Sequence, residues 1–442
     1  LLRGVSCAMA GVLAASPVAP VHAQAIPDGR TQTRVTTGPG GEVDIRTRTR
    51  QGKTGLNSFQ RFSVRRNENV NLHLPNGTDT LVNLVRDGVS SIDGTLKALK
   101  QGRIGGDLII ANPHGVVIGR TGAVKAGSLR LETPTQDFVD GFFTAPGQPR
   151  AGSLRQLLDG TAPRSDGDIS VQGRVEAVSG VRANAGRDVG ISGVIDVDAR
   201  RRMISAYANV GAPEGDTGPT VEVDAGRDVE VGADARVSVR GDGVTGPGRI
   251  DVRAGRDIDV GPNARIDADG VGDQDAGDLI LFADRNSTLA SGAVLSTSAL
   301  GAGDGGFLEF SAADTVINNG SLRATSLFGE PGHVLIDPVN IFLNTPVDTD
   351  GADYELIADD TITLWADIQT DGGDFTATAG NVITLQGPPR TIQTTGGDIE
   401  LTAGNQIELF SHTLSTRQVG GSTNFAFATS IGDSGDLRLF AP

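Results

Sequence analysis

The chain has 442 residues, of which 62 are glycine, whereas aromatic residues make up only 4%. A compact globular core of this length normally holds more large side chains, so the composition favours a thin, elongated core under many glycine turns. The net charge of −16 is uneven: residues 1–130 carry 17 Lys and Arg against 8 Asp and Glu, and the remainder carries 21 against 46. The basic residues lack aromatic interleaving, so we expect no nucleic-acid partner.

Residues 1–25 are typical of a secretory signal peptide. Arg3 supplies a short positive region, an apolar run follows, and small residues allow cleavage after Ala23 or Ala25. The single cysteine, Cys7, lies in this segment, so the mature chain would form no disulfide and no thiolate metal site. No other run approaches the roughly 20 apolar residues that span a bilayer, so we expect no stable membrane insertion.

Residues 26–104 alternate between apolar and polar side chains with the two-residue period of a β-strand. The pattern is clear around Val43 and Ile45, around Phe59 and Phe62, and from Val70 to Leu74. An end of a coiled β-structure would otherwise expose an apolar surface and an unpaired strand edge. We therefore expect this segment to form an N-terminal cap.

Residues 105–132 contain short β-branched strands separated by tight turns. A strand over Leu108 to Ala111 is followed by Asn112-Pro113-His114-Gly115, in which proline sets one φ angle and glycine closes the turn without a Cβ clash. The next strand, Val116 to Ile118, starts at once. The strands are too close in sequence for crossover helices, so the pattern predicts that the chain winds into a coil in which each winding stacks on the preceding one.

Residues 133–167 interrupt this pattern with several Pro and Phe residues. A short helix is predicted from Ser153, as the N-cap, to a stop at Gly160. We interpret 136–167 as an excursion from the coil. Phe138, Phe142 and Phe143 either pack onto the coil, which we favour, or form a patch for a partner.

From residue 168 onward the sequence repeats itself. The motif Ala-Gly-Arg-Asp-Val at 185–189 recurs at 225–229 and, with Ile, at 254–258. A Gly-Gly-Asp motif returns after 24 residues, at 372–374 and 396–398. Periods of about 20–30 residues that hold short alternating strands predict a parallel β-helix. The Arg and Asp of the first motif are expected to form surface ion pairs at coil corners, which contribute little to stability.

Catalytic chemistry has weak support in the sequence. The densest acid cluster fails as an EF-hand, because Val271 stands where a ligand oxygen is needed, so we expect its carboxylates to lie on solvated turns; they are Asp267, Asp269, Asp273, Asp275 and Asp278. The histidines are scattered without metal-ligand spacing. We therefore expect no metal, no cofactor and no enzymatic activity.

Three segments, in this order, resemble the secretion domain of two-partner exoproteins of the filamentous haemagglutinin type. They are Asn57-Ser58-Phe59-Gln60-Arg61-Phe62-Ser63-Val64, the stretch 84–96, and 107–116, which contains Asn112-Pro113-His114-Gly115-Val116. The family's usual signature is Asn-Pro-Asn-Gly-Ile, and a further family signature, Asn-Pro-Asn-Leu, is absent here. The resemblance makes Asn112, Pro113, His114 and Gly115, together with Asn57, Phe59 and Phe62, the candidates for transporter recognition.

The resemblance implies an all-β, right-handed parallel β-helix that a dedicated outer-membrane β-barrel transporter with POTRA domains exports from a Gram-negative periplasm. The chain would comprise a signal peptide (1–25), a secretion domain (26–135), the excursion (136–167) and a repeat shaft (168–442). The shaft would act as an adhesin on an unidentified host or cell-surface receptor or glycan.

Three alternatives stay open. The first is a secreted β-helical polysaccharide-active enzyme, and the second is a leukotoxin-like or haemolysin-like protein. The third is a fragment of a larger adhesin, because the chain starts without Met and ends on strand-like sequence at 437–442, where we expect an unprotected edge.

Overall fold

The computed structural model describes residues 24–207, 218–244, 246–409, 412–416, 425–426 and 436–439. The predicted signal peptide therefore lies almost entirely outside the described residues, and so does the cleavage candidate Ala23. The alternative candidate, Ala25, lies in the first strand, β1. None of the helices in the described part of the chain is long and apolar enough to cross a bilayer.

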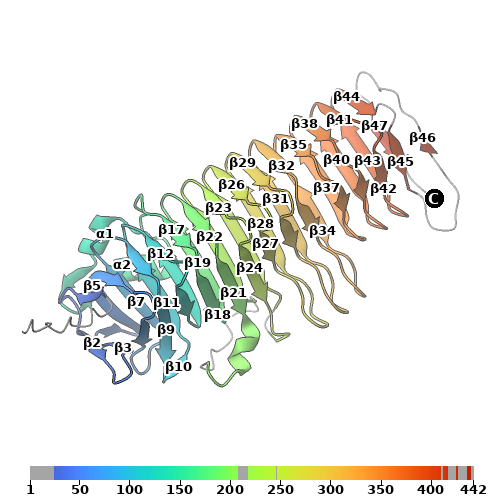
Figure 1. Cartoon of the computed structure of the whole chain (residues 1–442). Helices are drawn as coiled ribbons and strands as arrows, with labels where there is room; N and C mark the ends of the chain where they lie inside the picture. The colour runs from blue at the N-terminus through green and yellow to red at the C-terminus, as the bar shows by residue number, and fades with distance from the viewer. Residues whose placement is uncertain are drawn as a thin grey trace, which may run out of the picture.

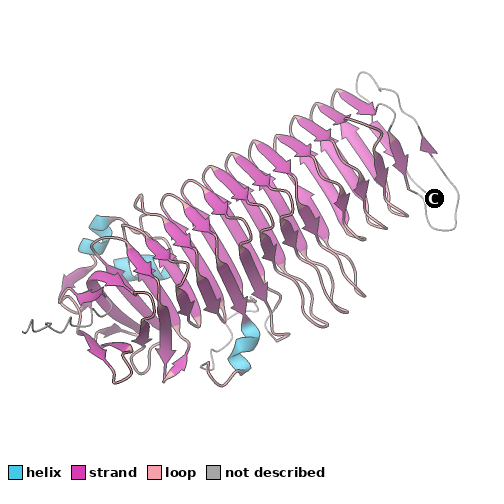
Figure 2. Cartoon of the chain, viewed as in Figure 1, coloured by secondary structure: helices cyan, strands magenta, loops and turns pink. Residues whose placement is uncertain are grey.

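The chain winds into an elongated coil whose strands stack into long sheets that run the length of the molecule (Figures 1 and 2). Sheet A contains β1 (Gln24–Pro27), β4 (Arg50–Gln51), β5 (Thr54–Ser63), β7 (Thr80–Val85), β11 (Asp107–Ala111), β14 (Ser128–Glu132), β19 (Gly180–Ala185), β22 (Thr220–Ala225), β25 (Arg249–Ala254), β28 (Asp278–Ala283), β31 (Phe307–Ala312), β34 (His333–Ile336), β37 (Asp353–Ala358), β40 (Phe375–Ala379), β43 (Ile399–Ala403) and β47 (Asp436–Leu439).

Sheets B and C form the other two long walls of the coil. Sheet B contains β2 (Thr33–Thr37), β3 (Val43–Thr47), β6 (Asn69–His73), β9 (Thr95–Lys100), β10 (Arg103–Ile104), β13 (Ala123–Lys125), β18 (Arg174–Ala177), β21 (Val194–Asp198), β24 (Arg236–Arg240), β27 (Arg265–Asp267), β30 (Val294–Ser296) and β33 (Ser321–Arg323). Sheet C contains β8 (Ser90–Ile92), β12 (Val116–Ile118), β17 (Ile169–Val171), β20 (Val189–Ile191), β23 (Val229–Val231), β26 (Asp257–Val260), β29 (Asn286–Leu289), β32 (Thr315–Asn318), β35 (Asn340–Leu343), β38 (Thr361–Leu364), β41 (Val382–Leu385) and β44 (Gln406–Leu409).

Near the C-terminal end a shorter sheet replaces sheet B as the third wall. It contains β36 (Val347–Asp348), β39 (Ile368–Gln369), β42 (Thr391–Gln393), β45 (Thr413–Ser415) and β46 (Phe425–Ala426). The strands of successive coils pair in parallel and in register, so that Leu81 lies beside Leu108, which lies beside Leu129. Because alternate residues point inward, these columns form one continuous apolar core. The prediction of a parallel β-helix is confirmed.

Both ends of the coil carry antiparallel strands. At the N-terminal end β1 and β4 pair with β5, and β2 pairs with β3, which forms the predicted cap over the first coil. At the other end β47 pairs antiparallel with β43, and β46 pairs with β45. The strand-like end of the sequence thus forms β47, the last strand of sheet A, which pairs only with β43 among the described residues, so the expectation of an unprotected edge stays a prediction.

The excursion folds as helix α1 (Gln136–Asp140), a hairpin of β15 (Phe143–Ala145) and β16 (Gln148–Pro149), and helix α2 (Ala151–Asp159). Helix α2 ends as predicted at Gly160, which has φ +71°. The predicted N-cap, Ser153, is wrong: the N-cap is Arg150, three residues earlier, whose N–H donates to the carbonyl of Phe142. A further 3-10 helix, η1, covers Ala199–Met203.

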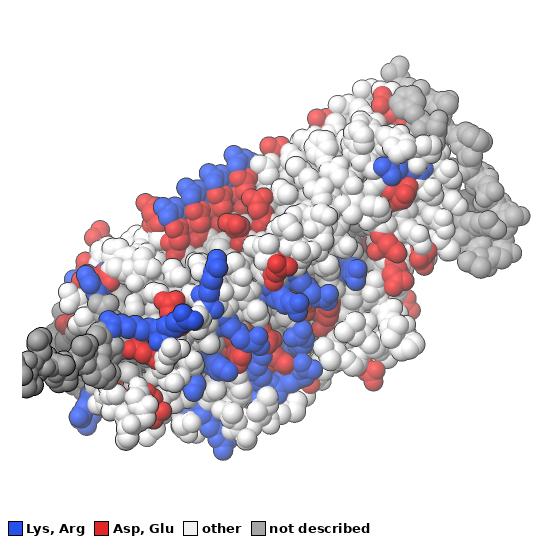
Figure 3. Space-filling model, in the orientation of Figure 1, with Lys and Arg blue, Asp and Glu red and all other residues white. Residues whose placement is uncertain are grey.

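The arginines of the Ala-Gly-Arg-Asp-Val motifs, together with Arg285 of the next coil, form a ladder of ion pairs between coils, and each motif arginine also lies 3.4–3.7 Å from the aspartate beside it. Each arginine Nε donates, over 2.6–2.8 Å, to an aspartate of the preceding coil. The pairs are Arg187–Asp168, Arg227–Asp188, Arg256–Asp228 and Arg285–Asp257, and they follow one edge of the molecule (Figure 3). The Arg227 guanidinium holds the pKa of Asp188 below its usual range. Repetition in register thus aligns the charges of neighbouring coils.

Glycine at the corners allows successive coils to approach closely. A Cβ atom on Gly277 would lie 1.6 Å from the carbonyl oxygen of Gly248 in the preceding coil. By contrast, a Cβ atom on Gly190 would meet no atom within 4 Å. Gly277 is therefore a position where the close approach of two backbones requires glycine, whereas at Gly190 the surrounding space would accept a side chain.

We expect Gly277→Ala to lower the free energy of unfolding by about 1–3 kcal/mol, because the added methyl group forces two coils apart. Gly190→Ala is the matched control and should change stability by less than about 0.5 kcal/mol. Urea unfolding followed by circular dichroism measures both. Equal effects of the two substitutions would contradict the close stacking of corners.

Candidate secretion-signature site

Asn112 lies at the turn between β11 and β12, and its side chain is fully buried. Its amide nitrogen donates to the carbonyl of Gly88 and to the hydroxyl of Ser90, both at 2.9 Å. Its amide oxygen accepts the backbone N–H of His114 at 2.9 Å. Asn112 thus fixes its own turn and ties that turn to the coil before it.

The rest of the turn is equally constrained. Gly115 has φ +104°, and a Cβ atom there would lie 2.5 Å from the carbonyl oxygen of Asp168 in the next coil. Pro113 is buried, and its carbonyl accepts the Ser165 hydroxyl at 2.6 Å. Of the four signature residues only His114 is exposed, with its ring Nε2 3.0 Å from the carbonyl oxygen of Arg86.

The earlier candidates lie on β5, two strands before β11 in sheet A. Phe59 and Phe62 are buried in the main core, with their ring centroids 5.1 Å apart. Asn57 is fully buried and donates through its amide nitrogen to the side-chain oxygen of Asn83 at 2.9 Å. Asn83 donates in turn to the carbonyl of Ile109 at 3.2 Å, which continues a polar ladder across three coils.

The excursion covers the outer face of sheet A over the first coils. Apolar side chains on that face form a second core with the excursion; they are Leu56, Val82, Leu84, Ile109 and Ala111 from the sheet, and Phe142, Leu154 and Leu157, with Phe138 and Phe143, from the excursion. The prediction that the Phe cluster packs onto the coil is confirmed.

Two arginines that the sequence did not single out anchor the excursion. Arg30 donates to the carbonyl of Val139 at 2.9 Å, and its guanidinium lies 5.3 Å from the ring centroid of Phe143. Arg130 donates to the carbonyls of Leu157, at 3.0 Å, and of Leu158. These carbonyls lie at the C-terminal end of α2, where the helix dipole favours a cation.

Glu132 lies where the chain leaves sheet A for the excursion, and only 2% of the residue is exposed. Both carboxylate oxygens accept the amide nitrogen of Asn184 at 3.2 Å, and Arg130 Nε lies 3.9 Å away. Burial outweighs these partners and raises the pKa of Glu132 to about 7. A carboxyl group that titrates near neutral pH therefore lies at the root of the excursion.

The acid cluster departs from the expectation of solvated turns. Asp267 and Asp269 are buried, and both bind Arg265, at 3.1 and 2.8 Å. Asp267 also accepts the Ser238 hydroxyl at 2.8 Å. The expectation holds for Asp273 and Asp275, which are exposed. Over the described ranges, no group of three or more His, Cys, Asp or Glu side chains could hold a metal ion.

Comparison with known proteins gives the chain its class. Residues 23–227 match the family described as the TPS secretion domain. A solved structure with a similar fold is the HMW1 secretion domain from Haemophilus influenzae, with 15% identity over 79% of this chain and 92% of that chain, at a TM-score of 0.46. No curated protein matches the chain.

The N-terminal part of the chain is a TPS secretion domain, and this domain implies a two-partner secretion exoprotein. A partner transporter exports such a protein across the outer membrane. The matched range continues past residue 135, through the excursion and into the first regular coils, and the boundaries expected from the sequence stay a prediction.

Glu132 gives a pH-dependent prediction. Its pKa is raised in the folded state, so the wild-type chain should lose stability, relative to Glu132→Gln, as the pH rises from about 4.5 to about 7. The expected loss is roughly 3 kcal/mol, because one pKa unit corresponds to about 1.4 kcal/mol. Urea unfolding at a series of pH values measures it.

The exposed Glu42 supplies the control, since Glu42→Gln should follow the wild-type pH profile. A difference between wild type and Glu132→Gln that is constant from pH 4 to pH 8 would show that Glu132 does not titrate in this range.

Proposed function

We propose that the transporter recognises the signature residues while the chain is extended, before the coil forms. The main support for this proposal is that the recognised residues are buried in the folded domain; they are Asn112, Pro113, Gly115, Phe59 and Phe62. A partner that recognises these side chains needs them accessible, and they are accessible only in the unfolded chain. POTRA domains could bind such a segment by adding it as a strand to a sheet edge.

On this proposal a signal peptidase cleaves after Ala23 or Ala25 in the periplasm of a Gram-negative cell. The cap and the first coils then fold outside the cell as they emerge. Each coil pairs only with its neighbours, as β11 does with β7 and β14, so folding can advance in the order of export. The anchored excursion would complete the domain once its last residues leave the transporter.

We further propose that the shaft is an adhesive, non-enzymatic surface at or beyond the cell surface. Support comes from the use of its charges: the ladder arginines and the buried Asp267 and Asp269 bind other side chains of the coil. Their role in the coil is structural, which leaves the protruding loops and sheet faces for contact with a target.

Export tests the first proposal. We expect Asn112→Ala to reduce the amount of chain in the medium at least fivefold when the cognate transporter is co-expressed in a Gram-negative host. The reason is the loss of a recognised side chain, so export should fall much further than the refolding yield of the same variant, purified and diluted from denaturant.

Asn76→Ala is the matched control, because Asn76 occupies an exposed Pro-Asn-Gly turn in the same domain. It should leave export unchanged. Normal export of Asn112→Ala would contradict the proposal. So would a fall in export matched by an equal fall in refolding yield, because Asn112 would then act in folding alone.

One observation favours a second candidate, a polysaccharide-active enzyme. The outer face of sheet A carries Glu309, Asp337 and Glu355, and burial raises the pKa of Glu309 and of Asp337. On the same face the rings of Phe307 and His333 stack with centroids 5.9 Å apart. Carboxyl pairs beside planar side chains are typical of glycoside hydrolysis.

This candidate predicts that the purified chain releases new reducing ends from neutral or acidic polysaccharides. Glu309→Gln should then abolish release, whereas Glu42→Gln should not. If no polysaccharide in a broad panel is cleaved by the wild-type chain, the non-enzymatic proposal stands.

A further inference from the structure

Consecutive coils carry a long loop between sheet B and sheet A, at residues 241–248, 268–277, 297–306 and 324–332. We call their described residues, which exclude residue 245, the loop ridge. In Figure 1 these loops project beyond the coil next to β24, β27 and β34.

The loops are ordered by contacts with one another. Isolated bridges join Gly270 to Ala299 and Ala299 to Ser326. The N–H of Leu327 donates to the carbonyl of Ala299, and that of Phe328 to the carbonyl of Gly301, both at 3.2 Å. The ridge is therefore a preformed surface, which lowers the entropic cost of binding.

Large apolar side chains stand exposed on this ordered ridge. The exposed fractions are 79% for Val244, 61% for Leu300, 63% for Leu327 and 79% for Phe328. Apolar side chains gathered on a fixed surface mark an interaction site more strongly than scattered ones do. Three of the four loops carry such groups, and those of the last two loops lie on consecutive coils, which indicates a partner that covers more than one coil.

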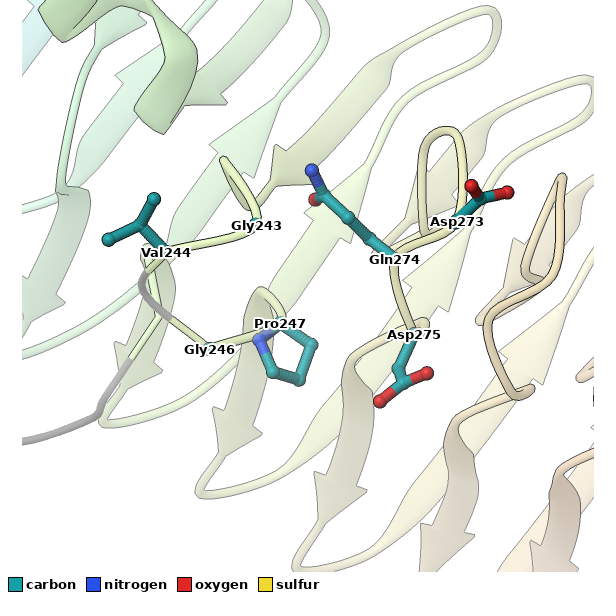
Figure 4. A pocket seen from close by; sticks show the side chains of 7 residues that line it. All are labelled: Gly243, Val244, Gly246, Pro247, Asp273, Gln274 and Asp275. Atoms are coloured by element: carbon teal, nitrogen blue, oxygen red, sulfur yellow. The ribbon is translucent and has the colours of Figure 1, made fainter.

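A pocket of about 480 Å³ lies between the first two loops (Figure 4). Val244 and Pro247 line it on one side, and Asp273, Gln274 and Asp275 on the other. One oxygen of Asp275 accepts the N–H of Asp304 at 2.9 Å, which fixes that carboxylate. Figure 4 shows that Gln274 points toward Gly243, whereas the carboxylates of Asp273 and Asp275 point toward the next loop, where they accept the N–H groups of Ala302 and Asp304. The pocket thus has an apolar wall, a polar wall and negative charge at its rim, and a long aliphatic side chain with a cationic end fits it.

The charge of the ridge selects among partners. The loops 268–277, 297–306 and 324–332 contain no Lys or Arg, and they carry four exposed acids, which are Asp273, Asp275, Asp304 and Glu330. Anionic lipid headgroups and sulfated glycans are repelled by such a surface. A basic partner is attracted to it.

We propose that the loop ridge binds a cationic amphipathic helix of a target protein. One Lys or Arg of the helix enters the pocket, and its apolar residues cover Leu300, Leu327 and Phe328. Successive coils repeat about every 4.8 Å, and residues three or four apart on a helix lie about 5–6 Å apart, so one helix face can match the row. The proposal rests on the adhesive role of the shaft and names the chemistry of its partner.

The test uses the full secreted chain and a fluorescent amphipathic helical peptide of Leu and Lys, with a Leu and Glu peptide as the charge-reversed probe. We expect the Lys peptide to bind at least tenfold more tightly than the Glu peptide, as measured by fluorescence anisotropy. A double substitution, Leu327→Asn with Phe328→Asn, should weaken binding at least tenfold. Asp273→Asn with Asp275→Asn should weaken it at least threefold and reduce its dependence on salt.

Val89→Asn supplies the control, because Val89 is 51% exposed but lies in the first coils, between β7 and β8. It should leave peptide binding unchanged. Equal binding of both peptides, no binding, or stronger binding to vesicles of anionic lipid than to the Lys peptide would overturn the proposal. So would self-association of the chain through the ridge, seen as a dimer in sedimentation that the double substitution abolishes.

Adherence of the wild-type chain to cells is measured in parallel. Adherence that the ridge substitutions do not change would refute the ridge alone and leave the adhesive proposal in place. Absence of adherence would refute the adhesive proposal, whatever the peptides show.

Discussion

The structure depends on backbone hydrogen bonding in register between one coil and the next. Once β7, β11 and β14 align residue by residue, every inward side chain lies against an inward side chain of the neighbouring coil. The apolar columns, the Arg–Asp ladder and the Asn57–Asn83 ladder all follow from this alignment. A single repeated constraint therefore places both the core and the surface charges.

The same constraint explains why the first coils differ from the shaft. Along the shaft, most outward-facing side chains are polar or charged, and apolar residues such as Ile280 and Phe342 interrupt the alternation. Over β5, β7 and β11 the outer face of sheet A is apolar, and the excursion covers it. The N-terminal domain thus has two cores on the two faces of one sheet, and Arg30 and Arg130 hold the second in place.

Much of this architecture could be predicted from the sequence, because it is encoded locally. Two-residue alternation and glycine turns indicate the coil, and the antiparallel cap follows from the need to cover its first end. The docking of the excursion had a sequence signal too: the strands Thr80–Val85 and Asp107–Ala111 are nearly continuous apolar runs, which is typical of strands buried on both faces.

Other features could not be predicted, since they depend on which residues meet across coils of unequal length. Arg227 binds Asp188, 39 residues earlier, whereas Arg256 binds Asp228, 28 residues earlier. Asp269 is buried because Ser298, 29 residues later, and Arg265 both bind it. The local sequence around such acids predicts solvated turns, because it does not indicate which residues of other coils will bind them. The burial of the secretion signature could not be predicted for the same reason, because the groups that enclose Asn112 belong to the preceding coil.

That burial has a consequence for turnover at the transporter. A chain that has left the cell and folded no longer displays Asn112, Pro113 or Gly115 to solvent. If the transporter reads these side chains in the extended state, the folded product cannot compete with newly made chains for the binding site. Export would then be free of product inhibition at any concentration of secreted protein, and folding would make each passage one-way.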